Sequence, residues 1–221
     1  MYYHGNEIYR YLLEHDLQDR YFWVSGNLWT MLYANSDGTP VFLCMVSRAD
    51  REEDLEQSAT PEEIWTFRRF RLLADQAGLP LLSLRFAENA HRACERFLVR
   101  RYRSGEPSRV LSSAQLLALF CACGLKFQGC TAGKKVNDQP SSAFHLWQRE
   151  HMGRSVIAVD LDLMRWDSSG VETIYELKRS WLPLEEWEPF ETDRANYLAQ
   201  FRLAQRAGTA CRIIYNVRHT K

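Results

Sequence analysis

The sequence has no excess of either charge, no long apolar run and only five lysines. Its 221 residues carry 28 basic and 28 acidic side chains, whereas a protein dedicated to nucleic-acid binding is usually basic. No stretch approaches the roughly 18 apolar residues needed to cross a bilayer. The first residues also lack the basic-then-apolar pattern of a signal peptide. We therefore expect a cytoplasmic chain that associates with no membrane.

The basic residues are unevenly placed along the chain. Residues 91–110 hold six arginines against two acids, while acidic residues concentrate in 50–63 and 185–193. A neutral total can therefore hide a positive face, and we expect nucleic-acid contacts from Arg100, Arg101 and Arg103. The alternative is that these arginines form the solvated side of an ordinary helix.

Six cysteines are present, and without a signal peptide they are expected to be reduced thiols. Cys121, Cys123 and Cys130 form one candidate for a small structural zinc site. Their spacing differs from the paired Cys-x2-Cys of common zinc sites. Cysteine at the end of an apolar helix also acts as a small hydrophobe, which is the alternative role.

Hydrophobic residues make up 46% of the chain, enough for a packed core. Thr60 and Pro61 are typical of a helix start, and Gly78 is typical of the position just past a helix end. The pattern as a whole predicts helices over 6–18, 61–77, 88–103, 113–123, 142–151 and 191–207, and strands over 20–33, 40–47, 79–86, 155–166, 171–179 and 210–217.

The two halves of the chain repeat the same order of predicted elements at an offset of about 131 residues. Residues 27–38 resemble 159–170, and residues 70–78 resemble 201–208. Similarity at a fixed offset is typical of a duplicated unit. The alternative is a chance likeness of two amphipathic α/β segments.

The second half contains a polar pattern on a predicted hairpin. Asp162 lies in the apolar run 156–164, and Glu176 and Lys178 lie in the run 173–178, with a turn sequence between the two runs. Side chains alternate along a strand, so Glu176 and Lys178 point the same way. A hairpin can bring Asp162 close to both, and two carboxylates with a lysine suit a divalent cation and an activated water.

This Asp, Glu-x-Lys pattern, followed by a helix and a strand, resembles the PD-(D/E)XK nuclease superfamily over roughly residues 141–217. Leu161 stands where the family often has proline. The resemblance implies an α/β fold with a mixed central sheet flanked by helices, as in restriction endonucleases, here built as a tandem pair of α-β-β-α-β units. We expect a module without catalytic residues at 1–110, a connection at 111–140 and the nuclease module at 141–221.

The resemblance also implies a magnesium or manganese ion and no nucleotide cofactor. Mg²⁺ prefers oxygen ligands, and a bound metal can activate water and relieve charge on a phosphate. Asp162 and Glu176 would be ligands together with the carbonyl of Leu177, and Lys178 would stabilise the phosphate charge. Further ligands are expected from Asp160, which alternation places on the face of Asp162, and Glu150.

Other residues near the pattern have two open interpretations. Gln200, like Tyr197 on the same helix face, and Arg179 are candidates for nucleic-acid contacts. The alternative is a helix that packs Tyr197, Phe201 and Ala204 on the sheet.

The first half has no equivalent of the polar pattern. When the turn glycines of the two halves are aligned, Asp162, Glu176 and Lys178 stand opposite Thr30, Cys44 and Val46, so no acid or lysine occupies those positions.

Three functions follow from these patterns. The leading one is a metal-dependent endonuclease that cuts DNA in restriction, repair, recombination or transposition. The second is a non-catalytic nucleic-acid-binding or assembly subunit that keeps the fold, and the third is a zinc-stabilised interaction protein. Double-strand cutting in this superfamily usually needs two active sites, so a homodimer or a partner subunit is expected if both strands are cut.

Overall fold

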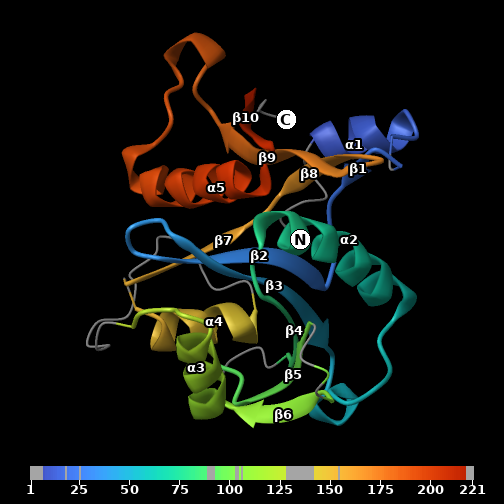
Figure 1. The fold of residues 1–221 in the computed structure, drawn as a ribbon. Coiled ribbons are helices and arrows are strands. Elements are labelled where there is room, and N and C mark those ends of the chain that lie inside the picture. Colours follow the sequence, from blue (N-terminus) through green and yellow to red (C-terminus); the bar gives the residue numbers. More distant parts are fainter. Residues whose placement is uncertain are drawn as a thin grey trace.

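Two mixed β-sheets and three layers of helices make up the part of the chain that the computed structural model describes (Figure 1). That part comprises residues 7–17, 19–24, 26–88, 93–102, 105, 107–127, 142–153 and 155–217. The six-stranded sheet has the order β6 (Arg109–Ser112), β5 (Arg96–Arg101), β4 (Leu81–Ala87), β3 (Pro40–Ala49), β2 (Leu28–Asn35) and β7 (Val156–Asp160). The four-stranded sheet has the order β1 (Tyr21–Phe22), β8 (Leu163–Asp167), β9 (Gly170–Ser180) and β10 (Ala210–Val217).

Two helices lie between the sheets and the others cover the outer faces. In Figure 1, α2 and α5 separate the sheet of β9 and β10 from that of β2 and β3, and one apolar cluster joins both helices to both sheets. A second cluster holds two helices on the far face of the six-stranded sheet, and a third holds one helix on the four-stranded sheet. The helices are α1 (Glu7–Glu14), α2 (Pro61–Ala77), α3 (Ser113–Ala122), α4 (Ala143–His151) and α5 (Arg194–Ala207), with 3-10 turns at η1 (Glu52–Asp54), η2 (Leu184–Glu186) and η3 (Glu191–Asp193).

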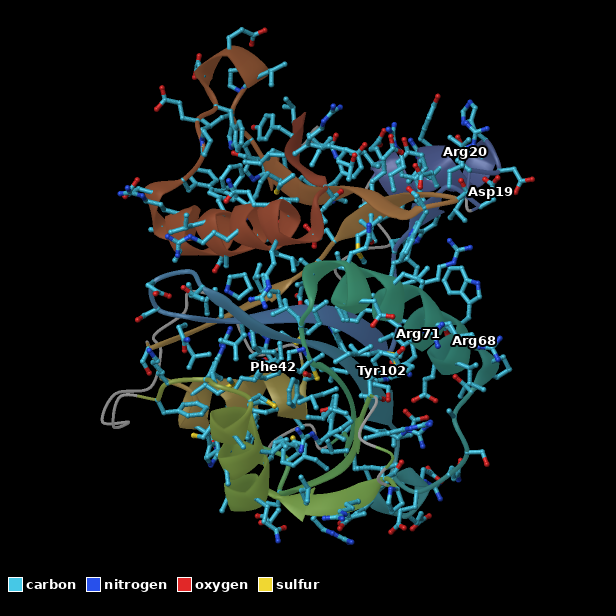
Figure 2. The ribbon with its side chains drawn as sticks, viewed as in Figure 1. Asp19, Arg20, Phe42, Arg68, Arg71 and Tyr102 are labelled. Atoms are coloured by element: carbon cyan, nitrogen blue, oxygen red, sulfur yellow. The ribbon has the colours of Figure 1, made fainter. Side chains whose placement is uncertain are left out.

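Large aromatic side chains fill the cluster under α3 and α4. Figure 2 shows Phe42 on this side of the six-stranded sheet, and its ring centroid lies 4.6 Å from that of Tyr33 and 4.8 Å from that of Phe120. On the other side, the guanidinium of Arg71 on α2 lies 5.6 Å from the ring centroid of Tyr102. The central strands are therefore covered on both faces.

The local sequence accounts for the bounds of α2. The Thr60 hydroxyl accepts a hydrogen bond from Glu63 N, and the Glu63 carboxylate accepts one from Thr60 N, which is a capping box. Pro61 begins the helix, and Gly78 ends it with a φ of 60°. The predicted helix over 61–77 is confirmed.

The predicted helix over 88–103 is wrong, because its second half forms β5. Phe97 and Val99 are buried while Arg96 and Arg100 are exposed, which is the alternation of a strand. Arginine favours helices, but pairing with β4 and β6 on either side outweighs that preference. The arginine-rich helix face expected here is therefore absent from the described residues 93–102.

Other element boundaries also differ from the prediction. The strand expected over 155–166 is two strands, since the chain leaves β7 at Asp160, enters β8 at Leu163 and so passes from one sheet to the other. The helix expected over 191–207 begins as a 3-10 turn and becomes α5 at Arg194. No helix within the described residues is long and apolar enough to cross a membrane.

Two β-β-α-β units with the same topology contain most of the sheet core. In one, the hairpin of β2 and β3 is followed by α2 and a parallel β4, and in the other the hairpin of β8 and β9 is followed by α5 and a parallel β10. Each sheet also contains one strand from the other half of the chain, because β7 pairs with β2 and β1 pairs with β8. The two sheets are therefore not divided at the expected module boundary near residue 140.

Strand register defines which positions correspond between the units. Glu176 pairs with Ile213 of β10, and Met45 pairs with Ser83 of β4. Ile213 and Ser83 stand equally far along the chain from the glycines that end α5 and α2. Glu176 therefore corresponds to Met45, and by the same register Lys178 corresponds to Ser47. The predicted correspondence with Cys44 and Val46 is wrong by one residue, because those side chains lie on the α3 and α4 side of the sheet.

Candidate functional site

Asp162 lies where the chain crosses between the two sheets. Leu163 pairs with Tyr175 in the hairpin of β8 and β9, which places Asp162 opposite Glu176. The Asp162 carboxylate accepts a hydrogen bond of 2.8 Å from Leu177 N, and its backbone carbonyl accepts one of 2.9 Å from the Tyr9 hydroxyl. The carboxylate is thus held against β9 at the point where β8 begins.

Glu176 and Lys178 lie on the face of β9 that α5 covers. Lys178 Nζ is 2.8 Å from Glu176 Oε1 and 2.8 Å from Asp193 Oδ2. Its ammonium group also lies 5.2 Å from the ring centroid of Tyr197 on α5. Glu176 is only 6% exposed, so its carboxylate depends on these partners for stabilisation.

Gln200 on α5 contacts the site directly. It is 1% exposed, and its Nε2 donates to Glu176 Oε2. Since a carboxylate only accepts, the amide must turn Nε2 toward it, and Oε1 is then buried without a hydrogen-bond partner. Gln200 therefore lies in the site itself, beside Glu176, and its contact with nucleic acid stays a prediction.

The packing interpretation of α5 holds only in part. Ala204 is buried against the sheet, whereas Phe201 is 52% exposed and Tyr197 lies against Lys178. Helical spacing brings Tyr197 and Gln200 to one face, and the polar partners on β9 explain why this face carries them.

Charge on the lysine is favoured by its surroundings. Burial alone would lower the pKa of Lys178, but the charges of Glu176 and Asp193 and their hydrogen bonds raise it above the usual value. Lys178 is therefore an ammonium cation at neutral pH, suited to stabilising negative charge rather than to removing a proton.

Tyr9 shows how acidic this corner is. Burial raises the pKa of its hydroxyl, and the charges of Asp162, Asp160 and Glu176 raise it further.

Tyr9 and Asp193 were not identified from the sequence. Asp193 lies in the acidic segment 185–193, which was a usable signal, whereas nothing in the sequence relates α1 to the hairpin.

Asp160 does not share a sheet face with Asp162, contrary to the alternation argument. It pairs with Met31 at the end of β7, and directly paired residues point to the same face. Met31 belongs to the cluster under α3 and α4. Glu150 is exposed on α4, which covers that same face. The charge of Asp160 nevertheless acts on the Tyr9 hydroxyl together with those of Asp162 and Glu176.

The arginines expected to contact nucleic acid do not gather around the site. Arg179 is exposed next to Lys178 but points to the opposite face of β9. Arg100 and Arg101 are exposed on β5, at the far end of the molecule from β9 in Figure 1. Arg103 lies outside the described residues. The two described arginines on β5 therefore lie far from Lys178, and the one on β9 faces away from it.

The oxygen atoms near Glu176 fit a hard cation better than a soft one. Asp162, Glu176 and the buried Gln200 Oε1 are the donor types that Mg²⁺ accepts. Within the described ranges, no three or more histidine, cysteine or acidic residues form a group placed to hold a metal ion. A metal here would therefore rest on two carboxylates together with amide, carbonyl or water oxygens.

The zinc candidate finds little structural basis. Cys121 is exposed and Cys123 partly buried at the end of α3. Burial raises the pKa of Cys123, which disfavours the thiolate that zinc requires. Cys130 lies outside the described residues.

Comparison with known protein families, with curated proteins and with solved structures finds no match for this chain. Its function must therefore be inferred from the chemistry around Asp162, Glu176 and Lys178.

Proposed function

We propose that the chain is a metal-dependent nuclease that hydrolyses DNA phosphodiester bonds at Asp162, Glu176 and Lys178. The observation that carries the proposal is the buried Glu176 carboxylate, which lies opposite Asp162 and contacts both Lys178 and Gln200. A buried carboxylate beside a lysine, a second acid and an unsatisfied amide oxygen is costly for stability. Such a cost is typical of a site kept for chemistry.

Each residue has a role that its contacts support. Asp162 and Glu176 would hold the metal, joined by the carbonyl of Leu177. In a strand, this carbonyl lies on the same edge as the Leu177 N–H that bonds to Asp162. When bound, the metal supplies an activated water and relieves phosphate charge. Lys178 stabilises the negative charge that develops on the phosphate, and Asp193 holds the ammonium group in position.

The β-β-α-β unit of β8, β9, α5 and β10 also supports a restriction-endonuclease-like fold for this half. The matching topology of the first half supports a tandem duplication in which Thr30, Met45 and Ser47 replaced the polar triad. A dimer or a partner subunit would supply the second active site for double-strand cutting.

A second candidate is a non-catalytic nucleic-acid-binding or assembly subunit. Lys178 is balanced by Glu176 and Asp193, and an ion pair of this kind can exist for structure alone. The neutral net charge points the same way. This candidate requires binding without hydrolysis.

Cleavage of plasmid and linear DNA with Mg²⁺ or Mn²⁺ tests the proposal. Lys178→Met and Glu176→Gln should each lower the rate by at least about 100-fold, since each removes a charge that acts in the transition state. Arg165→Gln is the matched control, because Arg165 lies on the same hairpin in an ion pair with Glu172 away from Glu176. Circular dichroism establishes that the variants fold. Cleavage that survives in both site variants contradicts the proposal, and binding without cleavage favours the second candidate.

A further inference from the structure

A pocket of about 410 Å³ opens between α5 and the edge strand β10, next to the candidate site. Its volume lies within the range of about 300–1,000 Å³ typical of small-ligand sites. Apolar side chains form most of the wall, and Glu176 is part of both the pocket and the site. The lining includes Glu176, Arg194, Tyr197, Gln200, Phe201 and Ile213.

The apolar wall is exposed to a degree that packing does not explain. Phe201 is 52% exposed and Ile213 is 37% exposed, although both lie beside a well-packed sheet. β10 is the last strand of its sheet among the described residues, so no further strand covers Ile213 there. Grouped exposed apolar side chains around a hollow are typical of a binding site.

The polar groups restrict what the pocket can bind. Arg194 is a surface cation whose described ion pair, with Glu191 at 3.2 Å, is an exposed one, and such pairs exchange readily for a phosphate. Gln200 contributes an acceptor, Oε1, that is buried without a partner. The complementary ligand has a flat apolar ring, an N–H group on its edge and an attached phosphate, which describes a nucleotide.

Only a nucleotide outside a base-paired stack can enter such a pocket. In a duplex, the faces of each base are stacked and its pairing edge is occupied. Proteins that bind single strands instead stack bases on aromatic side chains, which adds binding energy to the attraction between basic residues and phosphates. In a chain with no net charge, stacking can supply part of the affinity that phosphate contacts alone supply in duplex binding.

We infer that the pocket between α5 and β10 binds an unpaired nucleobase, so that the substrate is single-stranded nucleic acid or carries an unpaired nucleotide at the cut. The inference rests on the proposed function for the position of the cut, because Glu176 joins the pocket to Lys178. A base against Phe201 and Ile213 then brings its own phosphate to the site.

The test measures binding of the full chain, without divalent metal, to a single-stranded oligonucleotide that contains 2-aminopurine and to its blunt duplex. We expect tighter binding of the single strand and a fall in 2-aminopurine fluorescence as the base stacks. Phe201→Ala should weaken single-strand binding by about tenfold and remove the fluorescence change, while Phe201→Trp keeps both. Phe190→Ala is the matched control, since Phe190 is a 42% exposed aromatic outside the pocket lining.

The outcomes separate this inference from the proposed function. Equal affinity for single strand and duplex, or single-strand binding unchanged in Phe201→Ala, overturns the pocket inference even if the protein cuts DNA. Phe201-dependent single-strand binding by a protein that cuts nothing upholds the pocket and overturns the nuclease proposal. Phe201 is largely exposed, so its truncation should leave the fold intact, and a thermal melt of the variant checks this.

Discussion

The unit of β2, β3, α2 and β4 and the unit of β8, β9, α5 and β10 share one topology, but their helix-facing positions differ in chemistry. Residues that are apolar or neutral in the first unit are charged or amide-bearing in the second. Both helices end at a left-handed glycine, which sets the alignment. The corresponding pairs are Met45 and Glu176, Ser47 and Lys178, and Phe70 and Gln200.

The position of each unit explains the difference. β3 lies inside the six-stranded sheet with apolar clusters on both faces, so a polar pair there would be fully enclosed. β9 lies one strand from the edge of its sheet, and the pocket at α5 and β10 leaves the site close to solvent. The same topology can therefore serve packing in one half and keep a polar site accessible in the other.

The first unit has one buried ion pair near its equivalent end. Arg85, which pairs with Ser47 across the strands, bonds to both carboxylate oxygens of Glu63 at 3.1 and 2.7 Å. Its other nitrogen donates to the backbone carbonyls of Leu55 and Gln57. All of these contacts are internal, so Arg85 holds the 50–60 segment in place.

The largest effect on stability is expected when Phe70 of α2 receives the glutamine that stands at the corresponding position of α5. Phe70→Gln should lower the free energy of unfolding by about 4 kcal/mol, because it buries an amide without a partner and leaves a void in the core. Gln200→Leu should lower the free energy of unfolding by only about 2 kcal/mol, since Glu176 loses one donor but keeps Lys178, and the unsatisfied Oε1 is removed as well. Urea denaturation measures both, and equal losses would contradict the contrast between the units.

The buried ion pair of the first unit gives an intermediate effect. Arg85→Met should destabilise the protein by about 3 kcal/mol at pH 7, because Glu63 would stay buried without its cation. Burial raises the pKa of Glu63, but hydrogen bonds from Arg85 and Thr60 N, together with the charge of Arg85, outweigh burial and bring it below the ordinary 4.5. The stabilisation is thus present above about pH 4.5 and is lost as the pH falls through the lowered pKa.

Chemical denaturation of wild type and Arg85→Met between pH 7 and pH 3 checks this sign. The difference between the two proteins should narrow at the acidic end. A gap that stays constant across that range would mean that Arg85 acts through the Leu55 and Gln57 carbonyls rather than through the charge of Glu63.

The smallest expected effect concerns Cys211, which occupies the position of Leu81 in the first unit. Burial and the charge of Glu176 raise the pKa of its thiol to about 11. Cys211 should therefore react with iodoacetamide at pH 8 much more slowly than the exposed Cys121. Glu176→Gln should speed the reaction of Cys211 by a few-fold and leave Cys121 unchanged. Peptide mass spectrometry resolves the two sites, and an unaltered Cys211 rate would place Glu176 farther from β10.

Much of the second unit was predictable from local patterns. The turn at Gly170, the alternation around Glu176 and the cap glycine at 208 depend on neighbours within a few residues, so the hairpin, α5 and β10 were found. The strand character of 96–101 was missed because it depends on pairing with β4 and β6. Asp160 was misplaced because strict alternation assumes one continuous strand, and the chain instead changes sheets after it.

The amino-acid sequence alone determined the hairpin, helix and strand of the second unit, the α2 boundaries and the shared face of Glu176 and Lys178, because alternation and capping act over short distances along the chain. The tertiary structure decided that Asp162 bonds to Leu177 N, that Gln200 and Asp193 complete the site and that Tyr9 closes it from α1. It also placed β3 inside a sheet covered on both faces and β9 next to a sheet edge, which accounts for the apolar helix-facing positions of the first unit and the polar ones of the second. Those outcomes depend on contacts between residues far apart in the chain, which only the packing of the two sheets around α2 and α5 creates.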